Sequence, residues 1–195
     1  MLRAVFLDRD GTLSEEMGYV NHIDRFHLYP WSAAGIRKLN DARLPVVVIT
    51  NQSGVARGYF PETLVHEVHA KMRSELAAAA GARIDAIYYC PHHPDAGSGQ
   101  YRQKCECRKP GIGMLTQASR DLGLDLAYCY VVGDRYLDLK TAFRARAKAI
   151  LVKSGYGKGE HLYLRDTWDR QPDHVAEDLS DAVDFILKDI SRSAG

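Results

Sequence analysis

Phe6-Leu7-Asp8-Arg9-Asp10-Gly11-Thr12-Leu13 is the stretch that decides the fold of this chain. The apolar run over residues 4–7 predicts a buried strand of a parallel sheet, because it is apolar on both faces. Asp8 and Asp10 follow two residues apart, a spacing that points both side chains to the same side. Gly11 allows a sharp bend behind them. Two carboxylates at one strand end repel each other unless a cation or a shared proton lies between them, so the stretch predicts a charged site; a solvated Asp-Gly turn is the alternative.

The composition is ordinary for a soluble globular protein. Of the 195 residues, 46% are hydrophobic and 26% charged, which suits a single domain over residues 1–195. The formal net charge of +1 provides no strong field for binding nucleic acid or a membrane. No secretion signal precedes the first strand, and no apolar run is long enough to span a bilayer. We therefore expect a cytoplasmic protein without nucleic-acid or membrane partners.

Strand-like and helix-like patterns alternate along the chain. The alternation predicts an α/β fold with a mostly parallel sheet flanked by helices, in which ligands bind at the carboxyl ends of the strands. Segments 92–109 and 154–174 do not fit the alternation. The expected strands cover residues 4–7, 45–50, 86–89, 128–132 and 149–152, and the expected helices cover 32–42, 62–80, 112–122, 137–145 and 179–190.

Polar residues follow the other expected strands. The second strand ends in Thr50-Asn51-Gln52-Ser53-Gly54, whose hydroxyls and amides suit phosphate oxygens. The fourth leads to Gly133-Asp134-Arg135, and Asp138 can face the same side as Asp134 on a helix. In Arg108-Lys109-Pro110, the proline favours an extended Lys109 that reaches toward the sheet. A polar loop, a helix cap at Asp134 and a solvated basic pair are the plain alternatives.

Together these residues predict a site for phosphoryl transfer. Asp8, Asp10 and Asp134 offer the hard oxygen ligands that Mg²⁺ prefers. Mg²⁺ and Lys109 offset the repulsion between a carboxylate nucleophile and a phosphate, so that an aspartyl-phosphate can form. The second carboxylate can give a proton to the leaving oxygen and later take one from water.

The ordered set Asp-x-Asp-Gly-Thr, a strand-terminal Thr, a Lys and Gly-Asp-x-x-x-Asp resembles the haloacid dehalogenase (HAD) superfamily of phosphatases over nearly the whole chain. The resemblance implies a Rossmann-like fold with Asp8 as the nucleophile and Asp10 as the general acid/base. It also implies that Thr50 and Lys109 hold the phosphoryl group and that Asp134 completes the magnesium site. The segments beside the motifs are too short for a cap domain of the usual size, so we expect an open site and, by default, a monomer.

Three of the four cysteines predict a zinc-binding loop over residues 90–107. Cys90-Pro91-His92 and Cys105-Glu106-Cys107 are separated by twelve residues, and three thiols with one imidazole form a recognised ligand set for structural Zn²⁺. The intervening residues have little to bury, so a metal would stabilise them where a core cannot. His93 is the alternative ligand to His92, and reduced free cysteines are the plain alternative to a metal site.

The zinc loop narrows the resemblance to the HAD phosphatases that remove the 7-phosphate of D-glycero-D-manno-heptose 1,7-bisphosphate. These enzymes work in the cytoplasm on precursors of lipopolysaccharide or of nucleotide-activated heptose. The resemblance implies a small sugar phosphate as substrate. It also implies that the substrate is contacted by Gly18, Tyr19, Val20, Asn51, Ser53, Gly54, Arg57, Arg108 and Arg135.

Three other functions are compatible with parts of the sequence. A histidinol-phosphate phosphatase shares the zinc loop and the catalytic motifs, and remains the alternative. A phosphorylated receiver domain also uses an acidic pair, a Thr and a Lys, but it places the accepting Asp on a middle strand, and no Asp ends the 86–89 strand. A zinc module that binds nucleic acid is disfavoured by the nearly neutral charge.

Overall fold

A six-stranded sheet with the order β3-β2-β1-β4-β5-β6 organises the chain in the computed structural model, which describes residues 2–193. Each neighbouring pair of strands is parallel, which confirms the predicted α/β fold. β1 lies between β2 and β4, so three strand ends meet at the middle of one edge of the sheet. The strands are β1 (Val5–Leu7), β2 (Val46–Asn51), β3 (Ala86–Cys90), β4 (Tyr130–Gly133), β5 (Lys148–Val152) and β6 (His174–Ala176).

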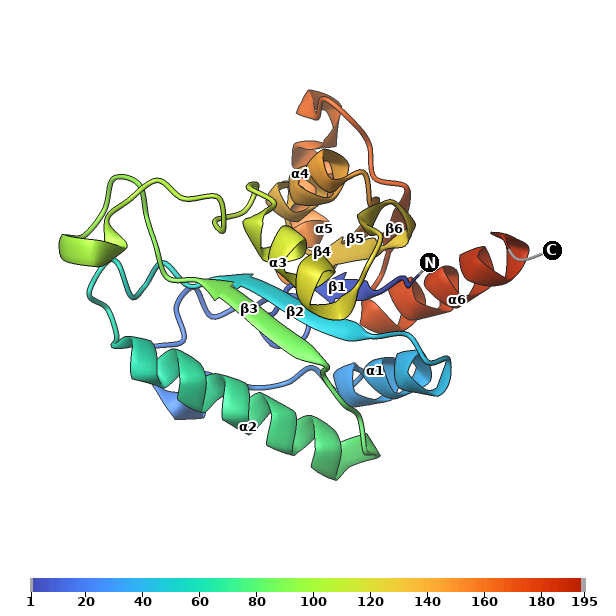
Figure 1. The fold of residues 1–195 in the computed structure, drawn as a ribbon, viewed down its shortest axis with the longest axis horizontal. Helices are drawn as coiled ribbons and strands as arrows, with labels where there is room; N and C mark the ends of the chain where they lie inside the picture. The colour runs from blue at the N-terminus through green and yellow to red at the C-terminus, as the bar shows by residue number, and fades with distance from the viewer. Residues whose placement is uncertain (1, 194–195) are drawn as a thin grey trace.

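Helices cover both faces of the sheet (Figure 1). α1, α2 and α6 pack against one face, where the β1 residues Val5 and Leu7 point, and α3 and α4 pack against the other face, where Phe6 points. Burial on both faces is the reason that the strands read as continuous apolar runs. The helices are α1 (Ser32–Asp41), α2 (Glu62–Ala80), α3 (Gly113–Leu122), α4 (Tyr136–Ala145), α5 (Gly157–Tyr163) and α6 (Leu179–Ser193).

The α2 helix shows how the sequence pattern sets an element. Val68, Met72 and Leu76 recur every four residues and are buried, so one stripe of the helix faces the core. Gly81 then ends the helix with a φ of 61°, a left-handed conformation that favours glycine, and its N–H donates to the carbonyls of Ala77 and Leu76. The bounds of α2 are those that the sequence predicts.

The segment 154–174 differs most from the expectation. It contains α5, and its last residue begins β6, which pairs with β5 at the edge of the sheet. A three-residue edge strand is too short to show a hydrophobic period, which explains why the pattern does not reveal it. Within residues 2–193 the structure contains no cap domain, as expected, and no helix long and apolar enough to cross a membrane.

Candidate active site

The predicted catalytic residues meet at the carboxyl edge of the sheet. Asp8 directly follows β1, Thr50 lies near the end of β2, and Asp134 directly follows β4. Because these three strands are parallel neighbours, their ends bring the side chains to one place. A cavity of about 300 Å³ opens there, and Asp8, Asp10, Thr50 and Lys109 all line it.

A cluster of three carboxylates forms the floor of the site. Asp8, Asp134 and Asp138 each place an oxygen within 4.8 Å of the others. The Asp134 side chain lies between Gly11 and Gly155, where an added Cβ would come within 2.2 Å and 2.3 Å of its Oδ2. Asp134 Oδ2 accepts a hydrogen bond from the Tyr156 N–H at 2.8 Å, whereas the buried Asp134 Oδ1 has no hydrogen-bond partner among the described residues.

This cluster fits a divalent cation. Burial raises the pKa of Asp8 to about 7, which Lys109 opposes and Asp138 reinforces. Burial also raises the pKa of Asp134 to about 9, and the charges of Asp8 and Asp138 add to the shift. The raised pKa values of two neighbouring carboxyls, and the unpartnered buried Oδ1 of Asp134, indicate that negative charge here lacks compensation. Mg²⁺ would supply the missing positive charge, with Asp8, Asp134 and Asp138 as candidate side-chain ligands.

Asp138 also belongs to the site. Its spacing from Asp134 predicts that the two side chains face the same side, but it does not predict a role for Asp138. It lies in the first turn of α4 and accepts a hydrogen bond from the Arg135 N–H at 3.2 Å, so it helps to cap the helix. Gly133 makes room for it, since an added Cβ there would lie 2.4 Å from the Asp138 side chain. The second Asp of Gly-Asp-x-x-x-Asp was the signal that could have identified it.

Lys109 supplies the positive charge beside the nucleophile. Its Nζ lies 2.9 Å from Asp8 Oδ1 and 2.5 Å from Asp138 Oδ1, and it is only 3% exposed. Burial lowers the pKa of Lys109, but Asp138 and Asp8 outweigh burial and raise the pKa overall, so the ammonium stays charged. Asn51 holds the backbone of this residue from both sides, because its Oδ1 accepts from the Lys109 N–H at 3.0 Å and its Nδ2 donates to the Lys109 carbonyl at 3.3 Å.

Asp10 lies outside the carboxylate cluster. The buried Arg9 donates from Nε and Nη2 to the two Asp10 oxygens at 2.9 Å and 2.7 Å, and Gln52 Nε2 donates to Oδ2 at 2.9 Å. Burial would raise the pKa of Asp10, but the charge and the hydrogen bonds of Arg9 lower it overall. Asp10 faces the cavity with its carboxylate fixed in place, while its role as a magnesium ligand stays a prediction.

Most of the predicted substrate contacts line the same cavity: Gly18, Tyr19, Asn51, Ser53, Arg57, Arg108 and Arg135. Two do not. Val20 is 5% exposed and packs into the core, and an added Cβ at Gly54 would lie 2.2 Å from the Phe60 ring, so Gly54 makes room for that ring. The cavity is also lined by Leu137, a variable position of Gly-Asp-x-x-x-Asp, and by Glu16 and Tyr156, which belong to no recognisable motif.

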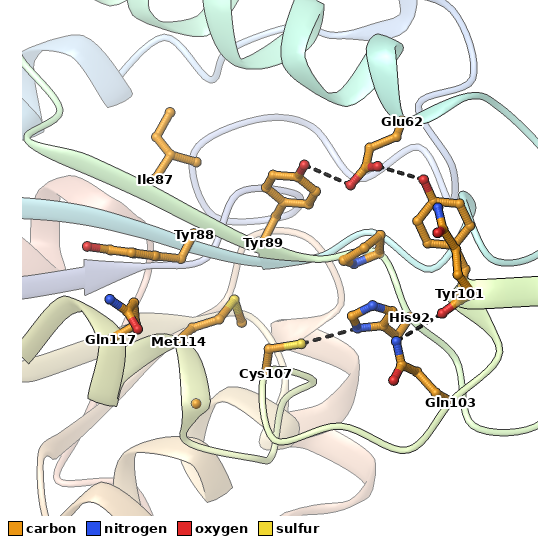
Figure 2. A pocket seen from close by; sticks show the side chains of 13 residues that line it. Glu62, Ile87, Tyr88, Tyr89, His92, Tyr101, Gln103, Cys107, Met114 and Gln117 are labelled. Carbon is orange, nitrogen blue, oxygen red and sulfur yellow. Dashed lines mark hydrogen bonds between the residues drawn. The ribbon is translucent and has the colours of Figure 1, made fainter.

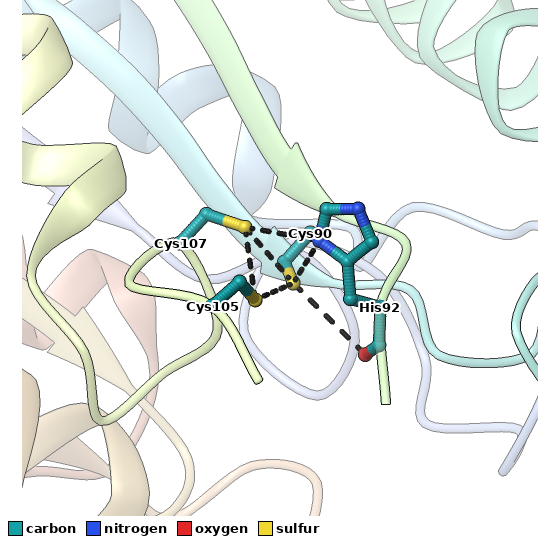
Figure 3. Close-up of side chains that lie close together, drawn as sticks. All are labelled: Cys90, His92, Cys105 and Cys107. Atoms are coloured by element: carbon teal, nitrogen blue, oxygen red, sulfur yellow. Dashed lines mark hydrogen bonds between the residues drawn. The ribbon is translucent and has the colours of Figure 1, made fainter. Parts of the chain in front are cut away.

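Figure 3 shows the three cysteines and His92 gathered around one point. The sulfur atoms of Cys90, Cys105 and Cys107 lie 3.3–3.5 Å apart, and His92 Nδ1 is 3.4 Å from Cys107 Sγ and 3.7 Å from Cys90 Sγ. Ligands about 2.3 Å from one tetrahedral zinc ion would be roughly 3.8 Å apart, so the four atoms fit such an ion with a small expansion. All four positions come from the protein, which is typical of a structural site.

Hydrogen bonds tie the zinc loop to α2. Figure 2 shows Glu62, the first residue of α2, between Tyr89 of β3 and Tyr101 of the loop, and both phenols donate to it, at 2.8 Å and 2.6 Å. These residues line a cavity of about 690 Å³ beside the cysteine cluster. The loop continues directly into Arg108 and Lys109, so its anchoring fixes the start of that catalytic segment.

Cys107→Ser is expected to remove the zinc and to lower the melting temperature, because the cluster then loses a thiolate ligand and the loop has little else to hold it. Elemental analysis of protein purified without chelators measures the metal, and calorimetry measures stability. Cys129→Ser is the matched control, since Cys129 lies outside the cluster and its hydrogen bonds to Ala4 and Asp125 can be kept by a hydroxyl. Wild-type protein without zinc would contradict the assignment.

The fold and the site define a HAD-like phosphatase. A model of the HAD-hydrolase-like family matches residues 106–182, the part of the chain that carries Lys109 and Asp134. A crystal structure of D,D-heptose 1,7-bisphosphate phosphatase from B. bronchiseptica, complexed with magnesium and phosphate, superimposes with a TM-score of 0.84. It is 34% identical, and the match covers 96% of this chain and 99% of that one.

Curated proteins agree with this structural match. The chain is 41% identical over 185 residues to the D-glycero-beta-D-manno-heptose-1,7-bisphosphate 7-phosphatase of Haemophilus ducreyi, which covers 94% of this chain and 98% of the relative. It is 40% identical over 190 residues to the corresponding enzyme of Thermosynechococcus vestitus, with 94% of each chain covered. The chain belongs to the D-glycero-D-manno-heptose-1,7-bisphosphate 7-phosphatase family of the HAD superfamily.

Proposed function

We propose that this chain is a magnesium-dependent phosphatase that hydrolyses the 7-phosphate of D-glycero-D-manno-heptose 1,7-bisphosphate through an aspartyl-phosphate. One observation carries the proposal. Asp8 lies beside the Lys109 ammonium, which also pairs with Asp138, and close to the Asp134 carboxylate, in a cavity that also presents three arginines, Arg57, Arg108 and Arg135. A nucleophilic carboxylate in a cavity rich in fixed positive charge suits a substrate that carries two phosphates.

In the first step an Asp8 oxygen attacks the phosphorus atom, and the bond from phosphorus to the sugar oxygen breaks. In the substrate complex, where the charges of the phosphates oppose its ionised form, Asp10 carries a proton that it gives to the leaving oxygen, and in the second step it takes a proton from the water that releases phosphate. Lys109 stabilises the charge on the transferring group, and Thr50 offers it a hydroxyl. Mg²⁺ would be held by Asp8, Asp134 and Asp138 and would supply further positive charge for the phosphoryl oxygens.

Arginine side chains at the rim select the substrate. Arg108 donates from Nη1 to the His92 carbonyl at 3.1 Å, so the zinc loop orients its guanidinium, and this side chain lines the cavity. Arg135 is held by Glu160 at 3.2 Å and lies 4.9 Å above the Tyr156 ring. Guanidinium groups bind phosphate through paired hydrogen bonds, so Arg108 is assigned to the phosphate that is not cleaved.

Arg108→Ala is expected to raise the Michaelis constant for the heptose bisphosphate at least tenfold, the value of one charge-assisted hydrogen bond or more. p-Nitrophenyl phosphate has no second phosphate, so its hydrolysis should change much less. Lys104→Ala, an exposed residue of the same loop, is the control. Equal losses on both substrates would deny Arg108 this role. A wild-type enzyme that prefers histidinol phosphate to the heptose bisphosphate would overturn the proposed function.

We also propose an oligomeric state, a cellular compartment and a structural metal for this chain. The chain acts as one domain over residues 1–195, as a monomer in the cytoplasm, with Zn²⁺ as a structural ion and without nucleic-acid or membrane partners. The four cysteines are all free of disulfides and three are gathered as metal ligands, which suits a reducing compartment.

A further inference from the structure

His93 follows the zinc-ligand candidate His92 but takes no part in the cysteine cluster. Its Nδ1 accepts hydrogen bonds from the backbone N–H groups of Asp95 and Ala96, at 3.1 Å and 2.9 Å. A neutral imidazole carries a single N–H, and a nitrogen that accepts two hydrogen bonds cannot be the one that carries it. The hydrogen-bond network therefore assigns the hydrogen of a neutral His93 ring to Nε2.

The Nε2–H group of His93 faces another donor. Arg57 Nη2 lies 3.0 Å from His93 Nε2, and a guanidinium has no acceptor. In addition, Arg57 Nε is buried and has no hydrogen-bond partner among residues 2–193. Two donors held this close without an acceptor repel each other, and an anion that accepts from both would relieve the repulsion.

Packing fixes this pair of donors. The Ala56 N–H donates to the Pro91 carbonyl at 3.2 Å, which joins the loop after β2 to the zinc loop. Farther along, an added Cβ at Gly97 would lie 1.6 Å from the Ala56 carbonyl oxygen, so the two loops touch through their backbones. The close contact holds together the two backbone segments that carry Arg57 and His93.

Arg57 lines the reaction cavity, and His93 adjoins the cavity behind it through the 3.0 Å approach of its Nε2 to Arg57 Nη2. Arg57 and Arg108 both line that cavity together with Asp8 and Lys109. Arg108 is anchored on the carbonyl of His92, the residue before His93. Donors from the loop after β2 and from the zinc loop thus converge on the side of the cavity where those loops meet.

We propose that the Nε2–H of His93 and the guanidinium of Arg57 together bind the phosphate of the substrate that is not cleaved, which makes His93 a specificity-determining residue. The inference rests on the proposed function and refines it, because it assigns to a residue of the zinc loop the recognition of the second phosphate. The two neighbouring histidines then have separate roles: His92 is a ligand of the metal in the loop, and His93 binds the second phosphate of the substrate.

His93→Asn tests the proposal without destroying the loop. An asparagine oxygen can still accept from the N–H groups of residues 95 and 96, as in an Asx turn, but the side chain places no donor where His93 Nε2 lies. The Michaelis constant for D-glycero-D-manno-heptose 1,7-bisphosphate is expected to rise roughly 10-fold to 100-fold, the value of a hydrogen bond to a charged group. The kcat for the bisphosphate and both constants for p-nitrophenyl phosphate should stay near those of the wild type.

His22→Asn is the matched control, because His22 also accepts a backbone N–H through Nδ1, from Asp24 at 3.3 Å, and its side chain is 67% exposed. Zinc content and melting temperature verify that the loop is intact. An unchanged Michaelis constant for the bisphosphate, or a parallel loss on both substrates with zinc retained, overturns the role of His93 and leaves the proposed function standing. A wild-type enzyme without any preference for the bisphosphate over the monophosphate overturns the proposed function, and the second-phosphate site with it.

Discussion

Asp8→Asn is expected to reduce turnover of the heptose bisphosphate below detection while the protein stays folded. The amide has the shape of the carboxylate but is not a nucleophile, so no aspartyl-phosphate can form. Lys109 and Asp138 remain paired at 2.5 Å in the variant, which preserves the buried charge compensation that the fold needs. Initial-rate measurements of phosphate release, with circular dichroism as the check on folding, test this expectation.

The control for this variant is Asp24→Asn, which removes a charge of the same kind from a side chain that is 84% exposed. Its activity should equal that of the wild type. If Asp8→Asn retained activity near the wild-type level, covalent catalysis by this residue would be excluded, whatever the metal content of the site.

Removal of magnesium is the second change with a large expected effect. Phosphate release should stop in EDTA and return when Mg²⁺ alone is added, because Lys109, which already pairs with Asp8 and Asp138, then has to offset the carboxylates of the cluster as well as the charge of the transferring phosphoryl group. Elemental analysis of zinc in the same samples shows whether the chelator has also emptied the cysteine site. Full activity in metal-free buffer would contradict the assignment of the carboxylate cluster.

The same site predicts how stability depends on pH. Folding raises the pKa of Asp8 to about 7 and of Asp134 to about 9, from 3.8. The metal-free fold therefore favours the protonated forms, and their contribution to stability is complete below the unfolded pKa and is lost as the pH rises through the folded values. Mg²⁺ binds the ionised forms, so the increase in melting temperature that it causes should be larger at about pH 8.5 than at about pH 5.5.

The sequence reveals the parts of this protein that local chemistry determines. The Asp8–Asp10 pair, Thr50 and Asp134 each follow or end an apolar run, and a parallel sheet brings such positions together whatever the details of packing. The bounds of α2 follow from its four-residue stripe and from Gly81. The clustering of thiols around residues 90–107 likewise identifies the three cysteines as candidate ligands, because few other environments use three cysteines so close together.

Other features depend on contacts between segments that are distant in the sequence. The position of Asp10 outside the carboxylate cluster depends not only on its neighbour Arg9 but also on Gln52, 42 residues away, whose Nε2 donates to Asp10 Oδ2 at 2.9 Å. Which of the two histidines joins the cysteines depends on the folded loop. It turns His92 Nδ1 toward Cys107 Sγ and His93 Nδ1 toward the Ala96 N–H. Tyr156 is held at the cavity by the hydrogen bond that its N–H donates to Asp134, 22 residues away in the sequence, and it belongs to no motif that predicts this position.

Chemical trapping of the covalent intermediate tests the central claim most directly. The wild-type enzyme is mixed with the heptose bisphosphate and Mg²⁺, quenched with acid during turnover and reduced with borohydride, which converts an aspartyl-phosphate to homoserine. Peptide mass spectrometry should then find homoserine at position 8 in the sample with substrate and none without it. Homoserine at Asp10 or Asp134, or its absence under conditions in which the dephosphorylated sugar is released in a burst ahead of phosphate, would contradict the assignment of Asp8 as the nucleophile.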